Sequence, residues 1–168
     1  MKTTTLLTTI SAIAFSAAFT VGAAAQQLDY TSMSEMFGEA VTAGATGAPQ
    51  RASDVPATMI IITQDEIARF PEYDIPGILR HYGGVDVTRY GYGDAQVSVR
   101  GAATGYTPRL LVLVNGREVY LDSYGYTAWS TLPVQLDEIQ QIEVVKGPQS
   151  ALYGFNAVAG VVNIITRN

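Results

Sequence analysis

The chain has 168 residues, with 10 Lys or Arg against 15 Asp or Glu, and its formal net charge is −5. This acidic balance argues against nucleic acid as a partner, because nucleic-acid binding needs a basic face. The sequence contains no cysteine, which excludes disulfides and thiolate metal sites, and its single histidine, His81, argues against a metal centre.

Residues 1–25 have the features of a secretory signal peptide. Lys2 supplies the positive charge, residues 6–21 are mostly apolar, and Ala23-Ala24-Ala25 fits a cleavage site before Gln26. We therefore expect the protein to be exported. No later stretch offers roughly 18 uninterrupted apolar residues, so no transmembrane helix is predicted after it. Residues 26–53 are rich in Gly, Ala, Thr and Ser, and we interpret them as a flexible tether.

Regular structure is expected from residue 59, where a short apolar strand, 59–62, precedes a helix. Thr63-Gln64-Asp65-Glu66 matches a capping box, and Pro71 ends the helix that follows it. Asp74 is placed to cap a second helix. The apolar stripe of that helix consists of Ile75, Ile78, Leu79 and Tyr82, and Gly83-Gly84 supplies its left-handed stop.

Four short strands are expected in the middle of the chain, at residues 85–88, 96–100, 110–114 and 117–121. Asn115-Gly116 between the last two is a strong hairpin signal, because a type I′ turn needs positive φ at both positions. Tyrosine-rich loops are expected at 90–94 and 124–129, followed by a helical stripe that consists of Leu132, Leu136 and Ile139.

The last 27 residues predict a strand, a tight turn, a short helix and a closing strand. Residues 142–146 are β-rich and stop at Gly147-Pro148, where proline cannot donate to a ladder. Residues 160–166 are almost wholly apolar, which suits a strand buried on both faces. The alternation of strands with short helices predicts a small α+β domain built on a mixed sheet.

Six motifs in order resemble the plug domain of TonB-dependent outer-membrane receptors of Gram-negative bacteria. They are Val55-Pro56-Ala57, Ile75-Pro76-Gly77-Ile78-Leu79, Gly84-Val85-Asp86-Val87, Val97-Ser98-Val99-Arg100-Gly101, Val112-Leu113-Val114-Asn115-Gly116 and the block from Ile142 to Asn168. The resemblance implies a plug domain over residues 54–168 that blocks a barrel, takes part in uptake of an iron–siderophore complex, cobalamin or a related scarce nutrient, and couples to the inner-membrane protein TonB.

The length leaves no room for the many strands of a transmembrane barrel. We therefore expect the barrel to be a missing C-terminal part of the protein or a separate chain. The location would be the outer membrane with a barrel. The alternative is a free-standing, soluble periplasmic module for binding or regulation, without transport activity. No Ser/His/Asp grouping, phosphate loop or dinucleotide fingerprint is present, so neither enzyme activity nor a cofactor is expected.

The resemblance also assigns site residues. Arg100 and Lys146 would pair with barrel glutamates and lock the plug, or else they are solvated charges at strand ends. Five aromatic residues would contact the ligand at the extracellular mouth, or else pack against the barrel or one another: Tyr90, Tyr92, Tyr124, Tyr126 and Trp129. The candidate TonB box, the segment that pairs with TonB, consists of Glu39, Ala40, Val41, Thr42 and Ala43, and the alternative is plain linker.

Overall fold

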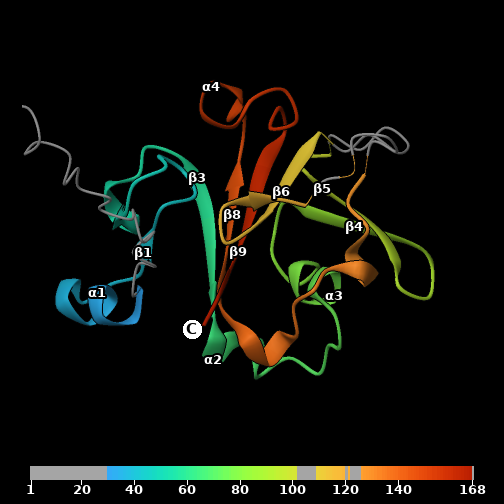
Figure 1. The fold of residues 1–168 in the computed structure, drawn as a ribbon, viewed down its shortest axis with the longest axis horizontal. Helices are drawn as coiled ribbons and strands as arrows, with labels where there is room; N and C mark the ends of the chain where they lie inside the picture. The colour runs from blue at the N-terminus through green and yellow to red at the C-terminus, as the bar shows by residue number, and fades with distance from the viewer. Residues whose placement is uncertain (1–29, 102–108, 120, 122–125, 168) are drawn as a thin grey trace, which may run out of the picture.

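A five-stranded mixed sheet organises the computed structural model, which describes residues 30–101, 109–119, 121 and 126–167. Its order is β3 (Thr58–Thr63), β8 (Ile139–Lys146), β9 (Gly160–Thr166), β6 (Leu110–Val114) and β7 (Arg117–Glu118). Strands β6 and β9 run parallel and the other neighbours run antiparallel. The predicted fold class, a small mixed sheet with short helices, is confirmed (Figure 1).

The two faces of this sheet carry different side chains, because successive residues of a strand point to opposite sides. Ile142 and Val144 of β8 belong to the main hydrophobic core, and so do Val162 and Ile164 of β9. Glu143 of β8, between the two core residues, points to the opposite face. The apolar run of β9 is therefore divided between the two faces. Val162 and Ile164 face the main core, and Val161 and Ile165 belong to other clusters.

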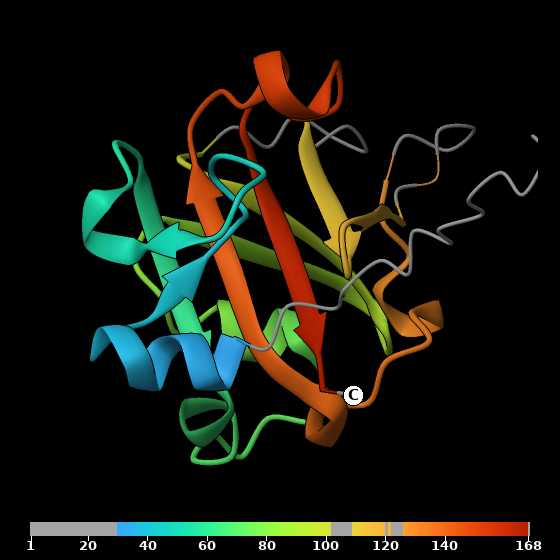
Figure 2. The same ribbon diagram turned by 60° about the vertical axis from the view of Figure 1, so that its left-hand side comes forward.

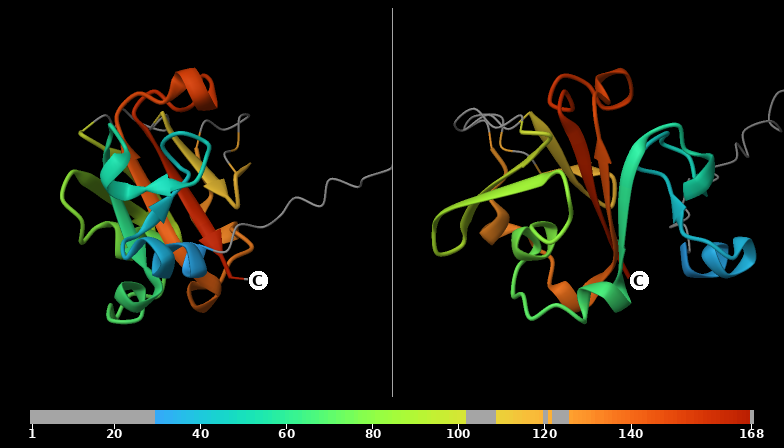
Figure 3. Two further views of the ribbon diagram at one scale, coloured as in Figure 1. Left: turned by 90° about the vertical axis from the view of Figure 1, so that its left-hand side faces the viewer. Right: turned by 180° about the vertical axis from the view of Figure 1, so that it is seen from behind.

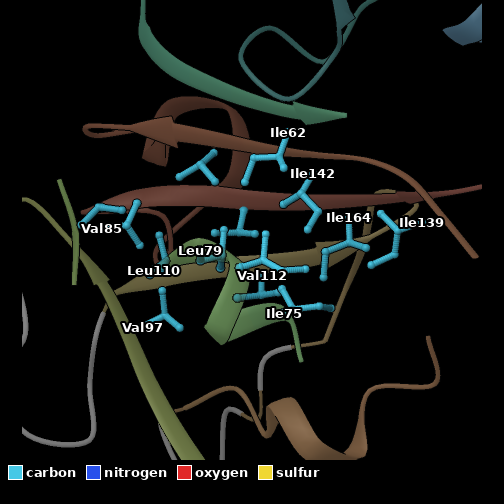
Figure 4. Packing of buried hydrophobic residues seen from close by; sticks show 14 of the residues in the cluster. Ile62, Ile75, Leu79, Val85, Val97, Leu110, Val112, Ile139, Ile142 and Ile164 are labelled. Carbon is cyan, nitrogen blue, oxygen red and sulfur yellow. The ribbon is translucent and has the colours of Figure 1, made fainter. Parts of the chain in front are cut away.

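The main core lies between the sheet and a layer formed by α3 (Ile75–Leu79) with the hairpin of β4 (Val85–Gly91) and β5 (Asp94–Val99). Figure 4 shows Ile142 and Ile164 of the sheet pointing toward Leu79 and Ile75 of the helix. Ile78 and Leu79 are completely buried, as the apolar stripe predicts.

The opposite face is covered by the N-terminal strap, by which we mean residues 30–51. It contains α1 (Tyr30–Phe37), β1 (Val41–Thr42) and β2 (Gln50–Arg51), and η1 (Ala52–Asp54) leads from it into β3. The strap and the α3 layer lie on opposite sides of the sheet (Figure 3), and β1 and β2 lie in front of β3 and β8 in Figure 2. Secondary structure thus occupies about half of the segment expected to be a flexible tether, because contacts with the distant β8 supply what local sequence lacks.

Local signals account for the short helices on the core side. The Glu66 carboxylate accepts hydrogen bonds from the backbone amide (2.8 Å) and the hydroxyl (3.1 Å) of Thr63, at the start of α2 (Gln64–Ile67). Asp74 Oδ1 accepts from the amide of Gly77 at 2.8 Å and caps α3.

The Asn115-Gly116 turn is confirmed, with φ of 50° and 75°, although the returning strand β7 is only two residues long. The prediction of a helical stripe from Leu132, Leu136 and Ile139 was wrong. The structure has 3₁₀ turns η2 (Trp129–Thr131) and η3 (Leu136–Glu138), and Ile139 begins β8 instead. Pairing with β3 and β9 outweighs the local helical spacing here.

No helix in the described part of the chain is both long and apolar enough to cross a bilayer. The predicted signal peptide, residues 1–25, lies outside the described residues.

Candidate functional site

Two basic side chains, Arg100 and Lys146, meet at one corner of the domain, which we call the basic corner. Arg100 follows β5, and its backbone amide donates to the carbonyl of Gly84 at 3.1 Å. Lys146 ends β8, and its Nζ donates to the carbonyl of Gly83 at 2.9 Å. The Arg100 guanidinium lies against Gly147, with Nη1 only 3.5 Å from where a Cβ of that glycine would be. Because Gly84 and Gly147 have no side chain, Lys146 can lie against the first and Arg100 against the second.

Neither cation of the basic corner has a carboxylate as an ion-pair partner among the residues that the structure describes. Asp86 lies on the neighbouring β4, and its Oδ2 accepts from the amide of Gly101 at 3.2 Å. Arg100 itself has φ of 56°, a left-handed conformation that costs a non-glycine residue free energy. An arginine is therefore held where the backbone favours glycine.

The aromatic residues predicted to bind ligand fall into two groups. Tyr90, Tyr126 and Trp129 line one shallow hollow that opens to solvent. Its floor is formed by the apolar side chains Ala95, Val97, Leu110 and Val112. The Tyr90 hydroxyl donates to Oε1 of Gln96 at 2.6 Å, so this tyrosine is oriented by its own hairpin. Tyr124 lies outside the described residues.

Tyr92 lies apart from the hollow, at the tip of the β4–β5 hairpin, where it is 97% exposed. Its ring stacks on Tyr73 at 6.2 Å between centroids, and the Arg89 guanidinium lies over the Tyr73 ring at 5.7 Å. Arg89 in turn makes two 2.7 Å hydrogen bonds to Asp74. These bonds are the main reason that the pKa of Asp74 is lowered and the pKa of Arg89 is raised.

Tyr73 and Arg89 were missed by the sequence analysis. No spacing rule relates a residue before the α3 cap to a residue of β4. Only the chain reversal between α3 and β4 brings them beneath Tyr92.

The candidate TonB box, residues 39–43, forms the inner edge of the strap. Val41 and Thr42 are completely buried in β1. The Gly44 amide, directly after the pentad, donates to Oε2 of Glu143 at 2.8 Å, and the Ala43 amide donates to Oε1 at 3.3 Å. The centre of the pentad, Val41 and Thr42, is therefore covered in this structure, where it pairs with β2 and contacts β8, whereas Glu39, Ala40 and Ala43 are half-buried.

Glu143 is itself a functional candidate that the sequence analysis read only as a strand residue. It is completely buried, and Gln141 and Asn163 donate to its carboxylate at 2.8 and 3.2 Å. Burial raises the pKa of the Glu143 carboxyl above its usual 4.5, although the hydrogen bonds from Asn163, Thr42 and Gln141 act in the opposite direction. The available signal was a lone acid inside an apolar strand, since such an acid needs partners when buried.

No group of three or more metal-ligating side chains occurs within the described ranges. His81 stacks on Phe70 at 4.5 Å and lies 2.8 Å from Oε1 of Glu72.

Comparison with known proteins agrees with this geometry. The sequence model of the family described as TonB-dependent Receptor Plug Domain matches residues 51–161, more than half of the chain. The vitamin B12 transporter BtuB of Photobacterium profundum is 37% identical over 118 residues, which cover 70% of this chain and 19% of that protein. The chain therefore belongs to the TonB-dependent receptor plug family.

Solved structures show the same fold. A mutant of the ferric enterobactin receptor PfeA from Pseudomonas aeruginosa, in complex with enterobactin, has a TM-score of 0.52 and 32% identity, over 67% of this chain and 18% of that one. The FpvAI–pyocin S2 complex has a TM-score of 0.63, over 76% of this chain and 16% of that one; at 22% identity it supports the fold alone. The chain spans about a fifth of the length of the relatives it matches.

Proposed function

We propose that this chain is the gate of an outer-membrane receptor: it fills the lumen of a barrel, takes part in uptake of a scarce nutrient and couples to TonB. The observation that carries the proposal is the basic corner. Two cations converge there, without a carboxylate ion-pair partner among the described residues, in a chain of the plug family.

The basic corner fits a lock between plug and barrel wall. Glutamates on a barrel would supply the missing anions, and a charge pair in a narrow, partly dehydrated lumen is worth more than one on an open surface. Arg100 has the planar fork that binds a carboxylate with two hydrogen bonds. Lys146 supplies only a point charge, and its bond to Gly83 aims that charge.

The aromatic residues fit a ligand with flat or extended apolar parts. A BtuB relative is named as a vitamin B12 transporter, and a PfeA relative was solved with enterobactin. An iron–siderophore complex or cobalamin is thus the substrate class we propose. Tyr92 is the most accessible contact, and the hollow lined by Tyr90, Tyr126 and Trp129 offers a second one.

Coupling to TonB would use residues 39–43 as an added strand. Strand addition depends on backbone hydrogen bonds, so a proline at Val41 should abolish binding. Val41→Ala should bind at least as well as the unmodified chain, because the smaller side chain loosens the buried β1. Binding of a purified TonB carboxy-terminal domain measures the difference. Equal affinity of the two variants for the TonB domain would mean that residues 39–43 are plain linker.

The whole proposal is tested by supplying the chain to cells that hold a plug-deleted barrel of a related vitamin B12 transporter. We expect the chain to lower the entry of large antibiotics and to restore TonB-dependent cobalamin uptake. Replacement of Arg100 and Lys146 by Gln should return the antibiotic leak, whereas Arg117→Gln, the same kind of change on the exposed edge strand β7, serves as the control. An unchanged leak with the chain present would refute the gating function.

The second candidate function is a periplasmic module that binds ligand or TonB without a pore. The observation that favours it is that both faces of the sheet are covered by the chain's own elements. Ligand or TonB binding by the purified chain, together with failure to close any barrel, would select this alternative.

A further inference from the structure

The strap is attached to the domain differently from the other elements. Its two strands form a small sheet of their own, separate from the five-stranded sheet. No residue of the strap belongs to the main core. Its apolar cluster with the sheet is small and consists of Tyr30 and Val41 against Ile165 of β9, with Met33 and Ala43 at the edge. The strap can therefore leave the sheet without opening the core.

Hydrogen bonds to β8 hold the strap where apolar contact is small. Oε2 of Glu143 accepts from the Gly44 amide at 2.8 Å, and Oε1 accepts from the Ala43 amide at 3.3 Å. Gln141 Nε2 donates both to the Val41 carbonyl (2.9 Å) and to Oε1 of Glu143 (2.8 Å). Side chains of β8 thus bind the backbone of three strap residues around one carboxylate.

The geometry at Gly44 shows how closely the two parts fit. A Cβ at this residue would lie 2.4 Å from Oε2 of Glu143, closer than atoms can approach. A side chain at residue 44 would therefore force the Glu143 carboxylate to shift away from the strap backbone. Gly44 and Glu143 are therefore the tightest point of this contact.

We propose that Glu143 is the latch that keeps the strap, residues 30–51, docked on the sheet, and that opening this latch exposes residues 39–43 for strand pairing. The second half of this inference rests on the proposed coupling to TonB. The latch itself is a property of this chain alone.

A buried carboxylate suits a contact that has to open and close. Docked, it is satisfied by directed N–H donors in a dry environment, where removal of one partner is costly. Undocked, the same carboxylate regains water, which repays part of the lost bonding. A purely apolar attachment would expose a hydrophobic surface to water each time the strap undocked. The Glu143 contact therefore stabilises the docked strap, and the undocked state carries only a moderate free-energy cost.

The latch also limits access to the pentad. Val41 and Thr42 have 0% exposure, so a partner strand cannot reach their backbone while the strap is docked. The apparent affinity for such a partner is then reduced by the fraction of molecules that are open. Weakening the latch should increase binding without any new contact to the partner.

Amide hydrogen exchange of the full chain tests the latch. In Glu143→Gln one acceptor oxygen becomes an NH₂ group that faces the strap amides, so residues 41–44 should exchange about tenfold faster or more. Val112 and Val162 in the core strands should keep their protection. Glu118→Gln, the same change on the exposed edge strand β7, is the control and should leave residues 41–44 unaltered.

A second variant leaves the sheet unchanged. Gly44→Ala adds a methyl group at the 2.4 Å contact and should release the strap with the same exchange pattern. Gly91→Ala, where nothing lies within 4 Å of the added Cβ, is its control. Unchanged exchange at residues 41–44 in both latch variants would overturn the proposal. Equal loss of protection in the strap and at Val112 and Val162 would also overturn it, because Glu143 would then be holding the whole fold.

The purified TonB carboxy-terminal domain provides the test of coupling. Both latch variants should bind it more tightly, by about the factor by which exchange at residues 41–44 increases. Strap release with no binding in any variant would refute the coupling part of the proposed function while the latch stands. Binding that is equally tight with and without the latch would refute the gated access to residues 39–43.

Discussion

The backbone amide of Gly44 donates a 2.8 Å hydrogen bond to the buried carboxylate of Glu143, 99 residues later in the chain. This bond joins a segment whose composition predicts a flexible linker to the strand that opens the terminal motif, β8. A single acid in β8 thereby holds part of the strap on the sheet.

The docking of the strap should depend on pH through this carboxylate. Burial raises the pKa of Glu143 when the strap is docked, and Tyr30 of α1 and Tyr153 of α4 (Ser150–Tyr153) also face it. Burial likewise raises the pKa of Tyr30, to about 12, and the pKa of Tyr153, so both phenols stay neutral below about pH 8. A raised pKa in the docked state means that docking is favoured by protonation, fully below about pH 4.5.

We therefore expect the protection of the Gly44 amide, corrected for its intrinsic exchange rate, to fall as pH rises from 4.5 through the raised pKa of Glu143. Glu143→Gln should remove this slope. Protection that increases over the same pH interval would contradict the assignment.

Replacement of Arg100 by glycine should have opposite effects on the stability of the isolated chain and on closure of the assembled receptor. The change relieves a left-handed φ of 56°, so the isolated chain should gain up to about 1 kcal/mol in free energy of unfolding. The same change removes a cation of the basic corner and should raise antibiotic leakage through an assembled receptor. Urea denaturation and a permeability assay measure the two effects. A less stable isolated chain would show that the arginine supports the fold and would rule out the lock.

Tyr92 and Trp129 should respond differently to truncation. Tyr92 is almost fully exposed, so Tyr92→Ala should change the free energy of unfolding by less than about 0.5 kcal/mol. Trp129 packs against the main core and lines the hollow, so Trp129→Ala should cost about 2 kcal/mol or more. If Tyr92 contacts ligand, only its loss will weaken uptake at unchanged stability. Unimpaired uptake by Tyr92→Ala would limit ligand contact to the hollow.

Gly160 should be the glycine least tolerant of a side chain. A Cβ there would lie 2.3 Å from the carbonyl oxygen of Val145 and 3.1 Å from Cγ2 of Val99. Because backbone must move to relieve this clash, Gly160→Ala should cost at least about 3 kcal/mol in urea denaturation. Gly91→Ala meets no atom within 4 Å and provides the comparison. Similar costs for the two variants would refute the steric explanation.

The sequence by itself determined the parts that depend on near neighbours. Alternating and apolar runs identified the strands, the Thr63–Glu66 pair and Asp74 marked the helix starts, and Asn115-Gly116 marked the turn. These signals work because a cap, a turn or a strand face is set by residues a few positions apart. Read in order, the motifs also identified the family that the comparisons confirm.

Only the tertiary structure decided which distant residues meet. Arg100 and Lys146 share a corner because β5 and β8 both end at the Gly83-Gly84 turn. Tyr73 and Arg89 lie beneath Tyr92 because the chain reverses after α3. Residues 30–51 pack on the sheet around Glu143, which is completely buried and accepts hydrogen bonds from the amides of Ala43 and Gly44. A local pattern cannot reveal such a bond, since its energy comes from the burial of one partner by the rest of the fold.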